Sequence, residues 1–244
     1  MAEPPSRKPA YEPVKGLPRV PTPAEIEARR AKRAPTLTGV APFGRDNCVD
    51  TGVGIAFKSV DRFDLLSAYI APRDLLVLRD VVFEINRNAD KVLAAGHAHI
   101  HAEVRQACRR LRKEITDGTM TVRELSGDFI DEVLEVQELV RKYSDSGSAD
   151  AEGNDGHHAG EAASIVWARS QRPVAIVLTN DGGAQRAASE CGVAWLNAAQ
   201  IMEVLVQSGE IDPRSAWDLI NQMDKVSGIA GPFPADASWR MTTR

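Results

Sequence analysis

The chain has few cysteines and no long apolar run, and these two absences narrow the classes to which it can belong. Its 244 residues include three cysteines, which are far apart, odd in number and without a C-x-x-C pair. This pattern argues against a disulfide framework and against a zinc site built from thiolates. No run of about 18 apolar residues occurs, and the N-terminus lacks the apolar core of a signal peptide. We therefore expect no membrane span and a cytoplasmic location.

The chain also has no excess of basic over acidic residues. The formal net charge is -4 and the pI is about 5.8, whereas a protein that binds nucleic acid through charge alone is usually basic. An enzyme that places a metal ion between its own carboxylates and a phosphate does not need such a surplus. The charge balance therefore disfavours a passive nucleic-acid binder and is compatible with a nuclease.

Proline, glycine and charge divide the chain into three parts. Residues 1–45 are rich in proline and in basic side chains, which predicts an extended or disordered arm with a short helix at 24–33. The arm is either a solubilising tail, which we favour, or a segment that binds RNA or a partner. Residues 46–225 predict one folded domain, interrupted at 144–156 by an exposed insert of Ser, Gly and Asp. Residues 226–244 predict an irregular tail.

Strand and helix patterns alternate through the folded part. Apolar runs predict strands at 75–78, 174–178 and 193–196, and a strand in CVDTGVGIAF that runs into a turn or helix. Residues 122–125 predict a brief strand or a turn. Helical spacing predicts helices at 63–70, 80–93, 99–116, 128–143, 159–169, 183–190, 198–207 and 213–223. This alternation predicts an α/β fold, an α/β/α sandwich with a central, mostly parallel sheet. In such sheets the functional groups gather at the carboxyl ends of the strands.

Four acidic residues stand beside apolar elements, where a carboxylate is costly to bury unless it is paired, hydrogen-bonded or bound to a metal. Asp50 ends the first predicted strand, and Asp181 follows the strand VAIVL. Glu84 lies inside the apolar helical stretch VVFEI, and Glu161 lies in the first turn of an apolar helix. A ligand set made only of oxygen suits Mg²⁺ or Mn²⁺. We expect these four carboxylates to meet at the carboxyl edge of the sheet.

Each of these acids also has a simpler structural interpretation. Asp50 and Asp181 could cap the helices that follow them. Glu84 could pair with a base on its own helix, such as Arg87. Glu161 could stabilise the start of its helix through the helix dipole. The metal hypothesis therefore depends on the four residues together.

Histidines offer other chemistry at two places. His97, His99 and His101 alternate and could bind zinc in a hydrolase, but the P-C-x-x-C motif of zinc deaminases is absent. A helix with incidental histidines is therefore the favoured interpretation. His157 and His158 lie just before the Gly-Glu pair of a predicted helix and could contact a substrate. The sequence contains no GxSxG motif, no P-loop and no complete dinucleotide-binding glycine motif.

Taken together, these stretches resemble the PIN-domain family. DNCVDTGVGIAF resembles the opening strand of the family, with Asp50 as its acid, and VVFEI resembles the second motif, with Glu84. GEAASIVWA resembles the third motif, with Glu161, and VLTNDGGAQRAASECGVAWL resembles the fourth, with Asp181. DRFDLL and AAQIMEVLVQSGEIDPRSAWDLINQM resemble helices of a toxin-type subgroup. The resemblance extends over residues 47–223.

This resemblance implies a Mg²⁺- or Mn²⁺-dependent endoribonuclease that cleaves RNA phosphodiester bonds. Asp50 and Asp181 would be direct metal ligands. Glu161 would be a ligand or would orient the attacking water, and Glu84 would complete the site. Three polar residues would hold the carboxylates or the scissile phosphate in place: Thr51, Thr179 and Asn180.

The resemblance also concerns partners. It implies RNA as the substrate and allows an antitoxin or another protein partner, as well as a homodimer. Two departures leave an alternative open, a catalytically inactive PIN-like scaffold or a module that binds RNA or protein. Gly52 follows Thr51 where relatives often have Asn or Ser, and Asn180 stands where many relatives carry an acid.

Overall fold

The structure is a computed structural model that describes residues 46–70, 75–90, 98–144, 158–171 and 175–230. The predicted arm, the predicted insert after Ser144 and the predicted tail after Ala230 lie outside these residues. The same is true of His97 and His157 and of the side chains of His99 and His101. None of the described helices combines the length and the apolar character that crossing a membrane would require.

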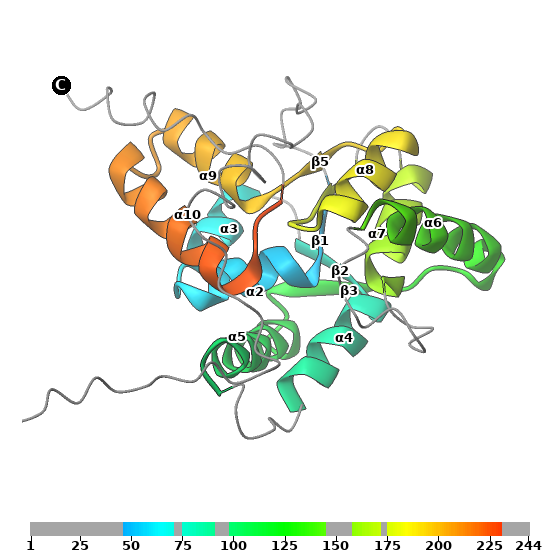
Figure 1. Ribbon diagram of the computed structural model, residues 1–244, viewed down its shortest axis with the longest axis horizontal. Coiled ribbons are helices and arrows are strands. Elements are labelled where there is room, and N and C mark those ends of the chain that lie inside the picture. The colour runs from blue at the N-terminus through cyan, green and yellow to red at the C-terminus, as the bar shows by residue number, and fades with distance from the viewer. Residues whose placement is uncertain (1–45, 71–74, 91–97, 145–157, 172–174, 231–244) are drawn as a thin grey trace, which may run out of the picture.

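A parallel sheet lies at the centre of the fold (Figure 1). Its strands are β1 (Asp46–Val49), β2 (Leu75–Leu78), β3 (Met120–Arg123), β4 (Ala175–Leu178) and β5 (Trp195–Leu196). They lie in the order β3-β2-β1-β4-β5, and every neighbouring pair is parallel. Nearly all residues of β1, β2, β4 and β5 are buried, as expected for apolar strands covered on both faces. The predicted α/β class with a parallel sheet is confirmed.

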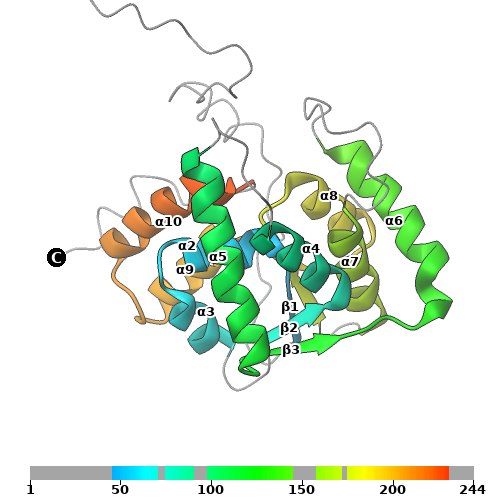
Figure 2. The ribbon, with the colours of Figure 1, turned by 90° about the horizontal axis from the view of Figure 1, so that it is seen from below.

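Helices cover both faces of this sheet (Figure 2). One face carries α2 (Thr51–Ser59), α3 (Phe63–Ile70), α5 (Ala98–Thr116), α9 (Ala198–Gln207) and α10 (Pro213–Ser227). The other face carries α6 (Ile130–Tyr143), α7 (Ala159–Ser170) and α8 (Gly182–Glu190). Helix α4 (Arg79–Asp90) packs against both α5 and α7. The predicted sandwich of three layers is therefore observed.

Two predicted helices differ from the observed ones by two or more residues at an end that the structure describes. The helix predicted from residue 128 begins with a short 3-10 turn, η1 (Gly127–Phe129), and its α-helical part starts at Ile130. The helix predicted to end at residue 223 continues to Ser227. It ends there because Gly228 adopts a positive φ of 61°, which terminates helices readily.

After α10 the chain returns to the sheet instead of leaving the molecule. Ile229 is only 1% exposed, and the N–H of Ala230 donates to the carbonyl of Asn180 at 2.8 Å. The carbonyl of Ala230 accepts from the side-chain amides of Gln185 and Asn197, at 2.8 and 2.9 Å. The start of the predicted irregular tail is thus a wall of the folded domain, beside the carboxyl end of β4.

The cysteines are the next feature of the core, and their spacing predicts neither a disulfide framework nor a thiolate zinc site. All three carry free thiols; Cys48 and Cys108 are buried, and Cys191 is partly exposed. Burial raises the pKa of the Cys48 thiol to about 12, so this side chain is neutral at physiological pH. Cys48 and Cys108 are therefore core residues and not reactive groups.

Candidate metal centre

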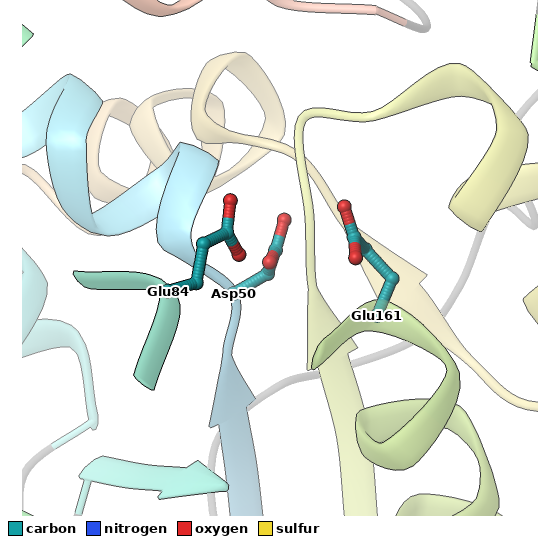
Figure 3. A group of neighbouring side chains, drawn as sticks. All are labelled: Asp50, Glu84 and Glu161. Atoms are coloured by element: carbon teal, nitrogen blue, oxygen red, sulfur yellow. The ribbon is translucent and has the colours of Figure 1, made fainter. Parts of the chain in front are cut away.

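Three carboxylates converge where the central strand β1 ends. Asp50 follows β1, Glu84 comes from α4, and Glu161 comes from the first turn of α7. One oxygen atom from each lies within 4.8 Å of the others, and Figure 3 shows their carboxylates facing a common space. Three of the four predicted ligands therefore form one group at the predicted edge of the sheet.

Asp50 is both a helix cap and a member of this group. Its Oδ1 accepts a hydrogen bond from the N–H of Thr51 at 2.7 Å, which caps α2, and its Oδ2 accepts from the hydroxyl of Thr179 at 3.0 Å. The residue is only 3% exposed. Each carboxylate oxygen has a lone pair left after these bonds, so capping and metal binding are compatible.

Glu84 is held by a residue of another helix and not by a neighbour on its own. Its Oε2 accepts from the hydroxyl of Thr51 at 2.8 Å. Thr51 thus binds Glu84 through its side chain and Asp50 through its backbone. The simpler interpretation, an ion pair between Glu84 and Arg87, is wrong for the described part of the chain, in which Arg87 has no ion-pair partner.

Close packing between α7 and α4 brings Glu161 to the group. A side chain on Gly160 would place its Cβ 3.1 Å from Cγ2 of Val81, so only glycine permits this approach without displacement. His158 precedes α7 with a positive φ of 67°, and its Nδ1 lies 3.6 Å from Oε1 of Glu161. The adjacent carboxylate of Glu161 is the main reason why the pKa of His158 is raised.

Asp181 lies in the same pocket but outside the group of three. Its Oδ1 accepts from the N–H of Ala184 at 2.7 Å and so caps α8. The hydroxyl of Thr179 links it to the group, because this hydroxyl donates to Asp50 and accepts from the N–H of Asp181 at 3.2 Å. Of the two acids predicted as direct ligands, only Asp50 therefore belongs to the convergent set.

Asn180 is used in the wall of the pocket, and its side chain does not hold a carboxylate. Its amide donates to the carbonyl of Gly52 at 3.2 Å and to the hydroxyl of Ser227 at 3.3 Å. Its Oδ1 accepts from the N–H of Ala198 at 3.0 Å. One buried amide thus joins the beginnings of α2 and α9 to the end of α10.

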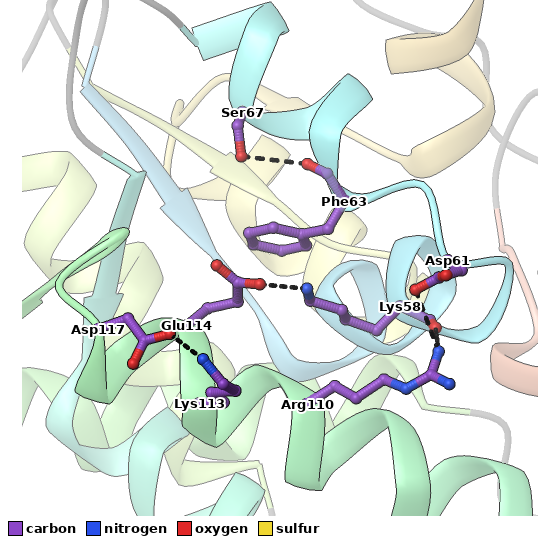
Figure 4. A network of polar contacts seen from close by, with 8 residues as sticks. All are labelled: Lys58, Asp61, Phe63, Ser67, Arg110, Lys113, Glu114 and Asp117. Atoms are coloured by element: carbon purple, nitrogen blue, oxygen red, sulfur yellow. Dashed lines mark hydrogen bonds and ion pairs between the residues drawn. The ribbon is translucent and has the colours of Figure 1, made fainter.

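The C-terminal end of α2 is anchored by a partly buried ion pair between Lys58 and Glu114 (Figure 4). Lys58 is 8% exposed, forms an ion pair with Glu114 of α5, and places its ammonium 4.3 Å from the ring centroid of Phe63. Arg110 of the same helix donates to the carbonyl of Lys58 at 3.4 Å. Because Asp50 caps the other end of α2, these contacts keep the helix that carries it in place.

Burial and repulsion by neighbouring charges raise the pKa values of Asp50, Glu84 and Asp181. Burial is the largest cause for Asp50, whose pKa lies well above the ordinary value, and the charges of Glu161, Glu84 and Asp181 add to it. Burial is also the main reason why the pKa values of Glu84 and Asp181 are raised. A bound cation would offset both the desolvation of the carboxylates and the repulsion between them, because it coordinates their oxygens and its positive charge attracts each of them.

The carboxylates line a cavity of about 270 Å³. Its described walls contain no lysine or arginine; the lining residues are Asp50, Thr51, Gly52, Ile55, Glu84, Asn88, Glu161, Asn180, Asp181, Gly182, Ser227, Gly228 and Ala230. Sequence reasoning missed Asn88 and Ser227. Asn88 follows Glu84 by four residues and thus shares its helix face, which was an available signal. No signal pointed to Ser227.

A larger hollow of about 630 Å³ lies between α4 and β3. Among its described lining residues the only acid is Glu124, which is ion-paired with Arg79. This hollow therefore offers no set of oxygen ligands, and the smaller cavity is the candidate site.

The donor set of the smaller cavity suits Mg²⁺ or Mn²⁺. All convergent atoms are carboxylate oxygens, which these hard ions prefer. Opposite ligands of a Mg²⁺ ion lie roughly 4.2 Å apart, close to the 4.8 Å limit within which the three oxygens lie. Thr51 and Thr179 orient two of the three carboxylates through hydrogen bonds. Asp50, Glu84 and Glu161 are the residues that would hold the ion.

The position of Asp181 predicts an unequal effect of two Asp-to-Asn substitutions. Asp181→Asn is expected to weaken Mn²⁺ binding about tenfold, as for a group just outside the ligand set, whereas Asp50→Asn should cost at least about 100-fold. Asn is as good a helix cap as Asp, so α8 should stay intact. Calorimetric titration with Mn²⁺ measures both effects. Equal losses would make Asp181 a direct ligand, as the sequence alone suggested.

Comparisons with known proteins do not supply a family for this chain. No protein-family model matches it, and no curated protein or solved structure matches it significantly. Its function must therefore be inferred from its own residues and from the group of carboxylates that they form.

Proposed function

We propose that this chain is a Mg²⁺- or Mn²⁺-dependent endoribonuclease that hydrolyses RNA phosphodiester bonds. The observation that carries this proposal is the convergence of Asp50, Glu84 and Glu161 in a pocket at the carboxyl edge of a parallel sheet. A divalent ion held there would offset phosphate charge and activate a water molecule. The choice of RNA as substrate follows from the resemblance of the four acidic motifs to the PIN-domain family.

Helix ends support the binding of a phosphate in this pocket. Asp50 and Asp181 cap α2 and α8, and Glu161 lies in the first turn of α7. Three helix N-termini therefore meet the pocket, and each contributes a partial positive charge. This field favours the ionised carboxylates and also an anionic substrate.

Each residue around the proposed ion position has its own role in the proposed reaction. Thr51 orients Asp50 and Glu84 so that both carboxylates face the ion position. Glu161 is the remaining carboxylate and would bind the ion or accept a hydrogen bond from the attacking water. His158 lies beside it and restrains its orientation. Most of the lining residues are buried or partly buried, and the lower local dielectric strengthens these electrostatic interactions.

The raised carboxyl pKa values favour an active site over the alternative of an inactive scaffold. The raised pKa values of Asp50, Glu84 and Asp181 mean that their ionised forms reduce the stability of the metal-free fold. Arrangements that cost stability are typical of functional sites. A role as a toxin, with an antitoxin or a second copy of the chain as partner, follows only from the resemblance and stays a prediction.

The proposal is tested by cleavage of single-stranded RNA by the purified chain. We expect cleavage in Mn²⁺, its loss in EDTA, and its return when Mn²⁺ is added in excess. Glu84→Gln should reduce the rate at least about 100-fold, since it removes one preorganised charged group of the site. Glu135→Gln is the matched control, because Glu135 is an exposed acid of α6 outside the pocket. Cleavage that survives Glu84→Gln would have another source and would contradict the proposal.

A further inference from the structure

Arg87 is an exposed cation of α4 that lies one turn beyond Glu84. It has neither an ion-pair nor a hydrogen-bond partner within the described ranges. Other arginines of neighbouring helices are engaged, since Arg110 pairs with Asp61 and Arg112 pairs with Asp90. The natural partner of Arg87 would be Glu84, but the carboxylate of Glu84 is bound to Thr51. The guanidinium is therefore left available for an external anion.

Arg87 also differs from the other positive groups that act on the pocket. The charge of Arg87 lowers the pKa of Glu84, and so does that of His158, which is itself beside Glu161. Arg141 acts on His158 but forms an ion pair with Glu138. Among these groups Arg87 alone has no carboxylate partner in the described residues. It is thus the side chain best suited to bring positive charge to a substrate.

Asn88 supplies a second uncommitted group at the same place. It lines the pocket, is partly buried, and follows Glu84 by one helical turn. Its side-chain amide has no hydrogen-bond partner within the part of the chain that the structure describes. An amide can donate two hydrogen bonds to phosphate oxygens. The carboxyl-terminal half of α4 therefore presents one neutral donor, Asn88, in the pocket wall and one charged donor, Arg87, at the adjacent helix position just outside the lining.

We propose that Arg87 and Asn88 form a phosphate-binding subsite on the α4 side of the pocket, with the phosphate ester of a nucleotide as its ligand. This inference rests on the proposed function, because it assigns these residues to the substrate of the same site. A guanidinium suits the role, since it stays charged and binds phosphate oxygens through two parallel hydrogen bonds. It would offset repulsion between the phosphate and the pocket carboxylates.

The test uses the full-length chain, Mn²⁺ and adenosine 5′-monophosphate as a probe that an endonuclease does not cleave. Arg87→Gln is expected to weaken binding of the probe about tenfold, the usual cost of losing a charge-assisted hydrogen bond. The same change should leave Mn²⁺ affinity equal or slightly higher, because it removes a cation beside Glu84. Weaker binding of the probe without weaker binding of Mn²⁺ excludes a folding defect, which would weaken both.

Arg214→Gln is the matched control. Arg214 is an exposed arginine in the first turn of α10, about 20 Å along that helix from Ser227 of the pocket. Arg214→Gln should change neither the Mn²⁺ affinity nor the affinity for the nucleotide probe. Asn88→Ala should weaken binding of the probe about threefold. Equal probe affinities of Arg87→Gln and Arg214→Gln would overturn the subsite. If the wild-type chain binds no Mn²⁺, the proposed metal site is contradicted. The probe affinities of Arg87→Gln and Arg214→Gln, measured in EDTA, would then decide whether the phosphate subsite exists.

Discussion

Replacing Asp50 by Asn is expected to weaken Mn²⁺ binding at least about 100-fold and to slow RNA cleavage, while making the metal-free protein more stable. Asn caps helices as well as Asp does, so the hydrogen bond from the N–H of Thr51 should persist. The substitution removes a buried charge that Glu161, Glu84 and Asp181 repel. We expect the cleavage rate to fall about 10²- to 10³-fold and the Tm in EDTA to rise by several degrees.

Asp212→Asn is the matched control for this experiment. Asp212 caps α10 in the same way, because its Oδ1 accepts from the N–H of Ser215 at 3.0 Å. It is exposed, however, and hydrogen bonding to the side chain and then to the backbone of Ser215 lowers its pKa. The same chemical change should therefore leave Mn²⁺ binding intact and should not raise the Tm. A destabilised Asp50→Asn protein, or one that still binds Mn²⁺ normally, would show that Asp50 is a structural cap only.

Mn²⁺ is expected to stabilise the protein at neutral pH and to have almost no effect near pH 4. The pKa values of Asp50, Glu84 and Asp181 are raised in the folded state, mainly by burial. In the unfolded chain these groups titrate near pH 4. Above that pH the unfolded state loses its protons first, so the stability of the metal-free fold falls as pH rises through the folded pKa values.

Ionised carboxylates bind the metal and protonated ones do not, so the stabilisation by Mn²⁺ grows over the same range. At neutral pH, Mn²⁺ at 100 times its Kd should add about 2.7 kcal/mol to the free energy of unfolding. Thermal denaturation between pH 4 and pH 8, with Mn²⁺ or with EDTA, measures this effect. In EDTA, the wild type should lose stability relative to Asp50→Asn as the pH rises. A constant difference between the two proteins would contradict the raised pKa of Asp50.

Much of the architecture follows from local patterns. The apolar runs at residues 75–78 and 174–178 predict strands because their length and flanking residues suit burial in a parallel sheet, and both strands are observed. The end of α10 was harder to predict. Residues 224–227 have ordinary helical character, and the stop depends on Gly228 and on where Ile229 can be buried.

The candidate site was predictable only in part. Asp50 follows an apolar strand, and the carboxyl ends of parallel strands meet at one edge, so its place could be inferred from order alone. The sequence could not show that Glu84 belongs to the group of three carboxylates and that Asp181 lies outside it, because this depends on which hydrogen bonds the two carboxylates form. Glu84 is bound by Thr51 of another helix, whereas Asp181 is bound by the N–H of Ala184 in the helix that it caps.

The amino-acid sequence by itself therefore determined the parallel sheet, its covering helices and the edge at which the acidic residues lie. These features depend on the periodicity of apolar residues, which acts over a few positions of the chain. Only the tertiary structure decided that Asp50, Glu84 and Glu161 share one space, that Asn88 and Ser227 line it, and that Arg87 has no partner among the described residues. Such choices are made by contacts between segments far apart in the chain, where packing and competition for hydrogen bonds set each side chain's direction.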